Sequence, residues 1–459
     1  MGQVPRILSW RNMLVLSLAV NFSLILRILK GGGGNSLDIM AYVSIWPVVS
    51  TSLDRTAYNS MWPVVSRTAS GTSSLSSSSC NYNEIEEDDD RIINLKLGDP
   101  TVYERYWQEM GEMTTMVIPG WQSLSYFSDN NNNLCWFLEP ELGKEIVRVH
   151  KVVGNAVTQD RFIVVGTGST QLYQAALYAL SPHDDSGPID VVSAAPFYSS
   201  YPLITDCLKS GLYRWGGDAK TYKGEGPYIE LVTSPNNPDG FLRHSVVNRS
   251  KGILIHDLAY YWPQYTPITS IADHDVMLFT ASKSTGHAGM RIGWGLVKDR
   301  ETARKMTEYI ELNTIGVSKD SQLRAAKVLK VVSDSCGRSG NETKTKSFFE
   351  HSYDAMSERW KLLRQAAKNS KRFTVPDFTS QRCNFLGKVF ESQPAFAWLK
   401  CEEGIIDCEK FLREKKKILT KSGKYFGDDQ SYVRISMLDR DSNFNIFLSR
   451  ISSSFNSTL

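Results

Sequence analysis

The chain has 459 residues, of which 41% are hydrophobic and 22% charged. This balance supplies a large core and excludes collagen-like, coiled-coil and wholly disordered chains. Lysine and arginine exceed aspartate and glutamate by only 52 − 49 = 3, so the chain lacks the concentrated basic face of a nucleic-acid binder, and no nucleic-acid partner is expected.

An apolar run lies close to the N-terminus. Residues 13–26 read MLVLSLAVNFSLIL, with Arg11 before them and Arg27 after them. A basic flank followed by an apolar stretch is typical of a signal peptide or signal anchor, although a bilayer span needs about 20 apolar residues. We expect residues 1–30 to be an uncleaved single-pass membrane anchor, with a cleaved signal peptide and a buried core helix as alternatives. The first two both place the rest of the chain on the secretory side, and the expected location is a membrane of the secretory pathway, at the endoplasmic reticulum.

The next segment, residues 31–91, reads as a linker. It contains a glycine run at 31–34, a serine-rich stretch at 70–79 and an acidic run at 84–90. Few apolar residues recur there with any period, which is typical of a solvated tether.

Beyond residue 91, strand-like and helix-like segments alternate. Apolar runs of strand length end in turns rich in glycine, asparagine or proline, and helical spacing follows several of them. The strands are predicted to open the segments 93–100, 162–180, 189–202, 228–240, 253–263 and 276–297, and a helix is predicted over 138–157. Such alternation predicts right-handed crossovers and a mostly parallel sheet. Ligands bind beyond the carboxyl ends of such strands, so the loops that follow them are expected to share one site.

The remainder of the chain predicts a second, smaller α+β module. One long helical stretch over 300–335 is expected to join it to the sheet domain, and its elements are a helix over 345–370, a strand at 395–401, a helix over 406–421 and a strand at 432–437. The expected division is an N-terminal arm with part of the small domain (92–135), a large domain (136–310), and a connecting helix with the small C-terminal domain (311–459).

The seven cysteines stand at wide spacing and none forms a CxxC pair. A zinc site is therefore not expected, and no metal ligands are predicted. The odd number argues against a disulfide framework but leaves one or two bridges open.

The segment GTGSTQL (166–172) stands at a strand-to-helix turn. Glycines allow the backbone to approach a phosphate closely, and the helix N-terminus offers unpaired N–H groups. Ser169 and Thr170 add hydroxyl donors, although a simple serine or threonine cap explains the same residues. The lysine of a nucleotide-binding P-loop is missing, which argues against an NTPase.

The segment ASKSTGHAGMRIGW (281–294) is more specific. Lys283 follows an apolar strand and precedes a glycine-rich turn, where a desolvated amine can form a Schiff base with a carbonyl cofactor. Thr280, Ser282 and Arg291 can hold an anionic group beside it, and arginine offers a bidentate grip.

Two further loops carry polar side chains at strand ends. Asp257 closes the apolar run ILIHD, where a carboxylate can pair with a protonated ring nitrogen, or cap the next helix. Tyr260 and Asn237, the latter in SPNNPDG, can donate hydrogen bonds into the same region, or serve packing and turn formation.

Together these segments resemble the fold-type I pyridoxal-phosphate enzymes, and within them the plant alliinase and tryptophan aminotransferase-related family. The segments that carry the resemblance are LGDP (97–100), SYFSD (125–129), CWFLEPEL (135–142), VGTGSTQL (165–172), APFYSSYP (195–202), SPNNPDG (234–240), HDLAYYWPQY (256–265), SKSTGHAGMRIGW (282–294) and VRISML (433–438). The resemblance spans residues 92–455 and implies an α/β fold: a large domain with a mostly parallel central sheet flanked by helices, plus a smaller α+β domain.

The resemblance also implies a role for each matching residue. Lys283 looks like the lysine that carries pyridoxal 5'-phosphate and moves the proton. Asp257 would pair with the ring nitrogen, Asn237 and Tyr260 would bind the ring oxygen, and Tyr198 would stack on the ring. Ser169, Thr170, Thr280, Ser282 and Arg291 would hold the phosphate, and Tyr126 would reach the phosphate of a neighbouring subunit, which implies a homodimer. Gly98 and Arg434 would bind the substrate, with Arg434 on its carboxylate.

The activity implied is transamination between an amino acid and a 2-oxo acid. The related branch uses L-tryptophan with pyruvate or 2-oxoglutarate and forms indole-3-pyruvate in auxin biosynthesis. An alliinase-type C–S lyase acting on alkyl cysteine sulfoxides is the alternative, because both reactions begin at the same carbon. Residues 30–90 contain one cysteine, Cys80, so the cysteine-rich segment of alliinases is missing, which favours the aminotransferase. A membrane-tethered scaffold without activity is the third interpretation.

Overall fold

A computed structural model describes residues 91–127, 133–182, 187–336, 346–402 and 404–452 of the protein. All of them belong to one compact unit, Glu86–Leu459. The predicted anchor or signal (1–30) and almost all of the predicted linker (31–91) lie outside these residues, so both stay predictions. In the part of the chain that is described, no helix is long and apolar enough to cross a membrane.

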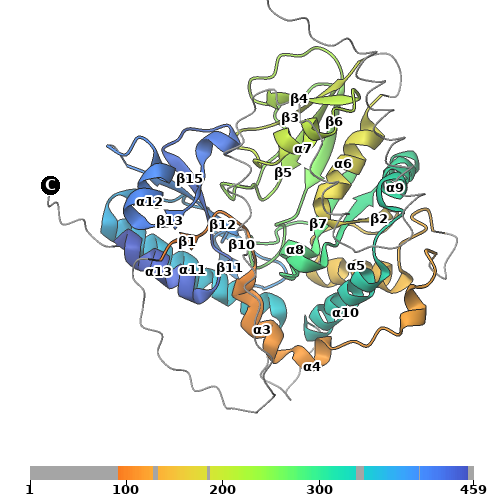
Figure 1. Ribbon diagram of the computed structural model, residues 1–459, viewed down its shortest axis with the longest axis horizontal. Coiled ribbons are helices and arrows are strands. Elements are labelled where there is room, and N and C mark those ends of the chain that lie inside the picture. Colours follow the sequence, from red (N-terminus) through yellow and green to blue (C-terminus); the bar gives the residue numbers. More distant parts are fainter. Residues whose placement is uncertain (1–90, 128–132, 183–186, 337–345, 403, 453–459) are drawn as a thin grey trace, which may run out of the picture. The chain divides into compact units, whose positions relative to one another are not determined.

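The larger sheet has seven strands in the order β2-β8-β7-β6-β5-β3-β4. Their bounds are β2 Phe162–Gly166, β3 Ile189–Ser193, β4 Tyr213–Asp218, β5 Tyr228–Thr233, β6 Gly252–Asp257, β7 Val276–Thr280 and β8 Gly293–Val297. Neighbouring strands are parallel except where β8 pairs antiparallel with β2 and β7. Figure 1 shows this sheet among the helices of the large domain. The prediction of an α/β fold with a mostly parallel sheet is confirmed.

Six helices accompany this sheet among the described residues. They are α5 Pro140–Val153, α6 Gly168–Leu180, α7 Tyr201–Cys207, α8 Ala281–Ser284, α9 Arg300–Thr314 and α10 Lys319–Cys336. Helix α6 packs against β7 and β8 and against α9, while α5 packs along α10. Helix α5 starts with proline in its first turn and stops at Gly154, whose φ of 70° is left-handed. Both features are encoded locally, because proline suits the first helical position and glycine the position after the last.

The predicted single helical stretch over 300–335 is wrong, because the chain forms two helices there. Helix α9 ends before Ile315, and both Ile315 and Gly316 have positive φ, at 52° and 97°. A Cβ at Gly316 would lie 2.8 Å from the side chain of Phe137, so the close approach of another segment accompanies the break. Helix periodicity continues across such a break, which is why the sequence pattern alone did not reveal it.

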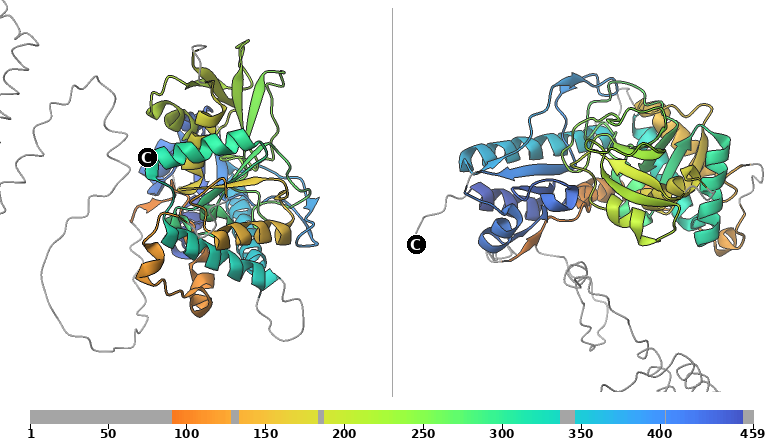
Figure 2. Two further views of the ribbon diagram at one scale, coloured as in Figure 1. Left: turned by 90° about the vertical axis from the view of Figure 1, so that its right-hand side faces the viewer. Right: turned by 90° about the horizontal axis from the view of Figure 1, so that it is seen from above.

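The smaller sheet has four antiparallel strands in the order β14-β15-β12-β9. Their bounds are β9 Phe373–Thr374, β12 Phe396–Cys401, β14 Lys421–Ser422 and β15 Tyr432–Ser436, and the accompanying helices are α11 Phe348–Ser370, α12 Cys408–Lys416 and α13 Asp441–Ser452. Helix α11, seen lengthwise in the right-hand view of Figure 2, packs against α13 and β9. A disulfide between Cys401 and Cys408 joins the end of β12 to the start of α12.

The predicted helix over 406–421 is correct only for α12. Lys417 is left-handed, and the next residues form β13, Ile418–Leu419, before β14 begins. Strand β13 pairs in parallel with β1, Ile93–Asn94, from the start of the described chain. A partner more than 300 residues away in sequence therefore decides that these residues form a strand.

The remaining short elements complete the described chain. They are α3 Glu104–Glu109, α4 Gly111–Thr114, the hairpin strands β10 Gln381–Arg382 and β11 Val389–Phe390, and 3₁₀ turns at Thr101–Tyr103, Gly120–Ser123, Ala288–Met290 and Gly423–Phe426.

A buried aromatic cluster supports the strands that carry the site. Phe279 and Trp294 stack with their ring centroids 6.1 Å apart, and Trp262 packs edge-on against both. The indole of Trp294 donates to His150, 2.9 Å away. Burial lowers the pKa of His150 to about 4, so its ring is neutral near pH 7 and can accept this bond. These aromatic contacts hold β7 and β8 in a closely packed part of the core.

Candidate active site

A cavity of about 210 Å³ lies at the carboxyl ends of β5, β6 and β7. The predicted cofactor residues that line it are Ser169, Thr170, Tyr198, Asn237, Asp257, Tyr260, Thr280, Ser282, Lys283 and Arg291. The fold therefore brings the strand-end loops to one place, as a parallel sheet requires. The roles assigned to these side chains stay predictions.

Lys283 lies in α8, the single turn of helix that follows β7. Thr280 caps this helix by accepting a hydrogen bond from the Ser282 amide at 3.2 Å. The Lys283 amine donates to the carbonyl oxygen of Gly98 at 2.5 Å. Burial, with a further contribution from Arg434, lowers the pKa of Lys283 from 10.5 to about 8. The amine thus loses its charge far more easily than an exposed lysine, as a nucleophile must.

Asp257 is the last residue of β6, and its carboxyl group is partly buried. One oxygen accepts from the Tyr201 hydroxyl at 2.7 Å and the other from the Ala259 amide at 3.1 Å. Burial raises the pKa of Asp257, while these two hydrogen bonds oppose the rise. No basic side chain of the described residues forms an ion pair with Asp257. A cation within the cavity would supply the missing counter-charge.

The N-terminus of α6 forms one end of the cavity together with Arg291. The Arg291 guanidinium donates to Ala288 carbonyl at 3.1 Å and to the Ser282 hydroxyl at 3.4 Å. A Cβ added at Gly168 would collide with this guanidinium. A Cβ added at Gly293 would lie 2.7 Å from the Gly168 carbonyl carbon. Because both positions are glycine, the Arg291 guanidinium and the N-terminus of α6 can lie close together. This arrangement suits a phosphate.

Asn237 and Tyr260 lie side by side in the cavity wall. The Asn237 amide nitrogen is 3.5 Å from the Tyr260 hydroxyl, and both side chains are buried. Burial raises the pKa of Tyr260 well above 10, so its hydroxyl stays protonated and can donate. The two groups together offer donors to one oxygen atom of a ligand.

Arg434, on β15, stands behind this pair and does not itself line the cavity. It donates to the Asn237 side-chain oxygen at 3.0 Å and to the Lys96 carbonyl at 2.7 Å. Its Nε atom is buried and has no hydrogen-bond partner. Arg434, which is predicted to bind the substrate carboxylate, therefore contacts Asn237, a residue of the cavity wall, rather than the cavity itself. Gly98, the other predicted substrate residue, reaches the site through its bond with Lys283.

Tyr126 is the one predicted cofactor residue that stands away from the cavity. Its side chain is 67% exposed and belongs to the N-terminal arm. Within one chain it does not contribute to this site, and a role in a second subunit stays a prediction.

Sequence reasoning missed Tyr201, Tyr173 and Thr233, which also line the cavity. Tyr201 donates to Asp257 and also shares a 2.7 Å hydrogen bond with the Thr233 hydroxyl. Its place in the aromatic loop APFYSSYP was the available signal, but the sequence does not tell which of the loop's tyrosines faces the carboxylate.

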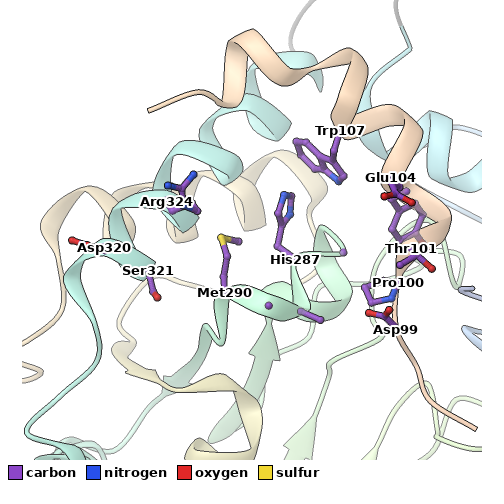
Figure 3. A pocket seen from close by; sticks show the side chains of 14 residues that line it. Asp99, Pro100, Thr101, Glu104, Trp107, His287, Met290, Asp320, Ser321 and Arg324 are labelled. Carbon is purple, nitrogen blue, oxygen red and sulfur yellow. The ribbon is translucent and has the colours of Figure 1, made fainter. Parts of the chain in front are cut away.

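A larger pocket of about 560 Å³ lies beside the segment 286–290, which follows Lys283 (Figure 3). Trp107, His287 and Met290 point into it, and α10 contributes Arg324. It shares Ala288 with the smaller cavity but contains none of the predicted cofactor residues. We therefore assign the reaction centre to the smaller cavity, although this pocket is larger.

The residues of the smaller cavity fit pyridoxal 5'-phosphate. The helix N-terminus and Arg291 suit its phosphate, and the Lys283 amine suits its aldehyde. The partly buried Asp257 carboxylate, which lacks a cation among the described side chains, suits its protonated ring nitrogen. Within the described ranges, no group of three or more histidine, cysteine, aspartate or glutamate side chains is arranged to hold a metal ion.

Comparison with known proteins is consistent with this geometry. The family described as allinase matches residues 93–455. Tryptophan aminotransferase-related protein 2 of Arabidopsis thaliana is 83% identical over 461 residues, covering 100% of both chains. Alliin lyase of Allium cepa var. aggregatum is 37% identical over 361 residues, covering 77% of this chain and 79% of its own. An aminotransferase structure from Staphylococcus aureus superposes with a TM-score of 0.55 at 17% identity, covering 81% of this chain and 96% of its own, and shows that the fold is that of the aminotransferases.

Proposed function

The chain belongs to the alliinase family, and from that premise we propose that it is a pyridoxal-phosphate-dependent aminotransferase whose donor is L-tryptophan and whose acceptor is pyruvate or 2-oxoglutarate. The product from tryptophan would be indole-3-pyruvate, which would place the reaction in auxin biosynthesis. The observation that carries the proposal is the partly buried Lys283 amine, with its pKa near 8, in the same cavity as the Asp257 carboxylate, which has no ion-pair partner among the described residues. The 83% identity to a tryptophan aminotransferase-related protein supports tryptophan as the donor.

When bound, pyridoxal phosphate supplies an aldehyde that captures the amino group and a ring that takes up the electrons released at the substrate's Cα. Asp257 would keep the ring nitrogen protonated, since a carboxylate stabilises a neighbouring positive charge. Lys283 would act as general base and remove the proton from the substrate's Cα. It would then act as general acid and donate that proton to the aldehyde carbon of the cofactor. Arg434 would hold the substrate carboxylate beside Asn237. Ser169 and Thr170 at the N-terminus of α6, with Arg291, would hold the phosphate.

The alternative is a C–S lyase that acts on alkyl cysteine sulfoxides. The 37% identity to an alliin lyase supports it, and both reactions require the same proton removal at Cα. Two assays separate them. With tryptophan and pyruvate, the aminotransferase forms alanine, whereas with an alkyl cysteine sulfoxide alone the lyase forms pyruvate. Pyruvate release without alanine formation would overturn the aminotransferase proposal.

An inactive scaffold is the third interpretation. Purified active enzyme should show a visible absorbance band that borohydride abolishes, because Lys283 would hold the cofactor through a reducible bond. A protein that shows no such band after incubation with pyridoxal phosphate would favour the scaffold.

We also propose that residues 1–30 anchor the chain in a membrane of the secretory pathway, at the endoplasmic reticulum. The support is the flanked apolar run at 13–26. The full-length protein is expected in the membrane fraction after alkaline carbonate extraction, and a variant that starts at residue 31 in the soluble fraction. Recovery of the full-length protein in the soluble fraction would contradict the anchor.

A further inference from the structure

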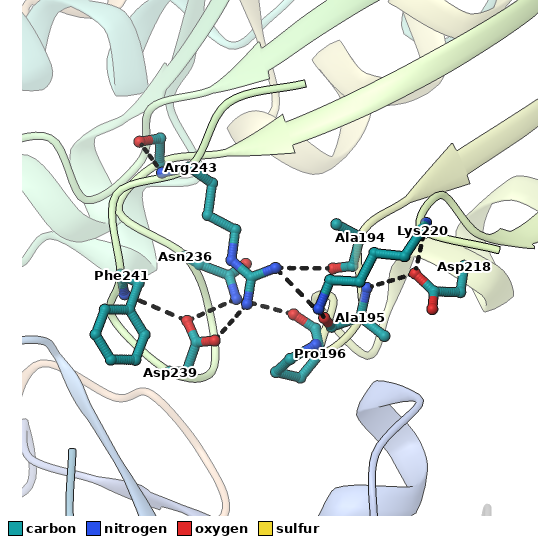
Figure 4. A network of polar contacts seen from close by, with 10 residues as sticks. Ala194, Ala195, Pro196, Asp218, Lys220, Asn236, Asp239, Phe241 and Arg243 are labelled. Carbon is teal, nitrogen blue, oxygen red and sulfur yellow. Dashed lines mark hydrogen bonds and ion pairs between the residues drawn. The ribbon is translucent and has the colours of Figure 1, made fainter. Parts of the chain in front are cut away.

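Arg243 links two loops that approach the cavity from different strands. Its guanidinium forms an ion pair with Asp239, in the loop that follows β5. It also donates to the carbonyl oxygens of Ala194 and Ala195, each 3.4 Å away, in the loop that follows β3. Figure 4 shows the guanidinium between the two loops. The Arg243 side chain is only 16% exposed, so these bonds are largely shielded from water.

Asn236 strengthens the same link. Its amide nitrogen lies 2.8 Å from the Pro196 carbonyl and 2.8 Å from the Asp239 carboxylate. Both Asn236 and Asp239 are buried. Three consecutive carbonyl groups, at 194–196, are thereby held by side chains of the other loop. We call Arg243, Asp239 and Asn236 the loop clamp.

Each clamped loop carries one side chain of the cavity. Tyr198 stands two residues after the last clamped carbonyl, and Asn237 stands between Asn236 and Asp239. Both side chains line the cavity, but Arg243 does not. Arg243 therefore acts on a ligand of this cavity indirectly, through the loops that carry these two side chains.

We propose that Arg243 is a positioning residue that, through the loop clamp, sets where Tyr198 and Asn237 stand in the cofactor cavity. The inference rests on the proposed function in one respect only, that the ligand beside the two loops is pyridoxal phosphate. Arginine suits this task better than lysine because its planar guanidinium can serve the carboxylate and the carbonyls at once. Loss of the charge also leaves Asp239 buried without its cation, which loosens both loops.

The first test measures the affinity of the apo-protein for pyridoxal phosphate by titration calorimetry. Arg243→Gln is expected to raise the dissociation constant about tenfold or more, the size expected when a charge-assisted hydrogen bond is lost. Arg243→Lys should recover part of the loss, since it keeps the charge. The matched control is Arg304→Gln, which breaks an exposed ion pair of the same spacing, with Glu308 on α9, together with the neighbouring pair to Glu301, and should bind like wild type.

The second test follows a spectroscopic property of the cofactor-loaded protein. Asn237 and Tyr260 can donate hydrogen bonds to the ring oxygen of the cofactor, and such donors favour its deprotonated form. In Arg243→Gln the Asn237 loop should be looser, so the visible band should change at a higher pH than in the wild type. A purely structural loss would lower the unfolding temperature and leave this pH unchanged.

The third test does not depend on the cofactor. In apo-protein, hydrogen exchange should accelerate in peptides covering 194–198 and 234–241 in Arg243→Gln and Asp239→Asn, and stay unchanged in α9. Wild-type affinity and an unshifted pH in Arg243→Gln, or unaltered exchange in both loops, would overturn the inference. If wild-type protein fails to bind the cofactor, the proposed function falls, while the exchange result still decides whether the clamp holds the loops.

Discussion

Lys283 and Asp257 are two partly buried charged groups, and neither forms an ion pair with another side chain of the described residues. Burial lowers the pKa of the lysine and raises that of the aspartate, so in both cases it favours the neutral form. Such opposed shifts within one cavity are typical of acid–base sites. Each residue would regain a partner from the same ligand, the lysine through a covalent bond and the aspartate through an ion pair.

The Lys283 pKa predicts how cofactor capture depends on pH. Because burial lowers this pKa from 10.5 to about 8, the neutral amine predominates above about pH 8 and the ammonium form below it. The rate at which apo-protein captures pyridoxal phosphate, followed by the growth of visible absorbance, should rise up to about pH 8 and then level off. A rate that keeps rising towards pH 10 would mean that the amine is not desolvated. Lys283→Ala should keep the fold but show neither capture nor turnover.

Tyr201 predicts a second effect at the residue scale. Its hydrogen bond lowers the pKa of Asp257 against the effect of burial, so Tyr201→Phe should raise that pKa. The carboxylate would then lose its charge at a higher pH, and cofactor affinity should fall by about fivefold, as expected for one hydrogen bond of about 1 kcal/mol. The loss should be greater at acidic than at neutral pH in a calorimetric titration.

The control for this variant is Tyr222→Phe. Tyr222 donates to the Asp190 carboxylate at 3.0 Å, a similar hydroxyl–carboxylate bond whose residues do not line the cavity. This variant should bind the cofactor like wild type. Equal losses in both variants would show that the Tyr201 effect is not specific to Asp257.

At the scale of elements, the contact between β8 and the start of α6 shapes the anion end of the cavity. Gly293 begins β8, and a Cβ there would lie 2.7 Å from the Ser169 amide nitrogen and 2.9 Å from the Phe279 carbonyl oxygen. These neighbours are backbone atoms, which cannot rotate away as a side chain can. The strand and the helix therefore fit together only with glycine at this position.

Gly293→Ala should displace the N-terminus of α6 and weaken cofactor binding. Overpacking of this kind costs about 1–3 kcal/mol of unfolding free energy, to be measured by urea denaturation. Gly295→Ala on the same strand is the control, because the nearest atoms to its Cβ would be side-chain carbons at 3.6 Å or more. If both variants bind the cofactor and unfold alike, the close contact at Gly293 does not shape the site.

At the scale of the whole molecule, the exposed Tyr126 raises the question of a second subunit. Its side chain is 67% exposed, and Trp121 and Leu124 nearby are 70% and 82% exposed. Exposed apolar side chains gathered in one segment are typical of an interface. The expected homodimer, in which Tyr126 serves the partner's cavity, would cover such a segment.

Mixed dimers provide a direct test of that expectation. Tyr126→Phe and Lys283→Ala proteins would be unfolded together and refolded, so that hybrid dimers form. One site of the hybrid would then combine an intact Lys283 with an intact Tyr126 from the other subunit. Activity of the mixture should therefore exceed the mean of the two parents. A mixture no more active than that mean would contradict a shared site.

The sequence by itself determined the alternation of strands and helices, the mostly parallel sheet, and the loops that meet at its edge. These features depend on local patterns: apolar runs of strand length, glycine at tight turns, and polar residues where strands end. The positions of Lys283, Asp257 and Arg291 beside one cavity follow from the same logic. The membrane anchor, the linker and the individual roles of the site residues stay predictions.

Only the tertiary structure decided which distant groups touch. The Tyr201–Asp257 bond, the contact of Arg434 with Asn237 and the bond from Lys283 to Gly98 join residues 56, 197 and 185 positions apart. Strand β13 and the break between α9 and α10 likewise depend on partners far away in sequence. The physical reason is that periodicity reports the face a residue presents, whereas hydrogen-bond partners and close backbone approaches are set by the packing of whole elements.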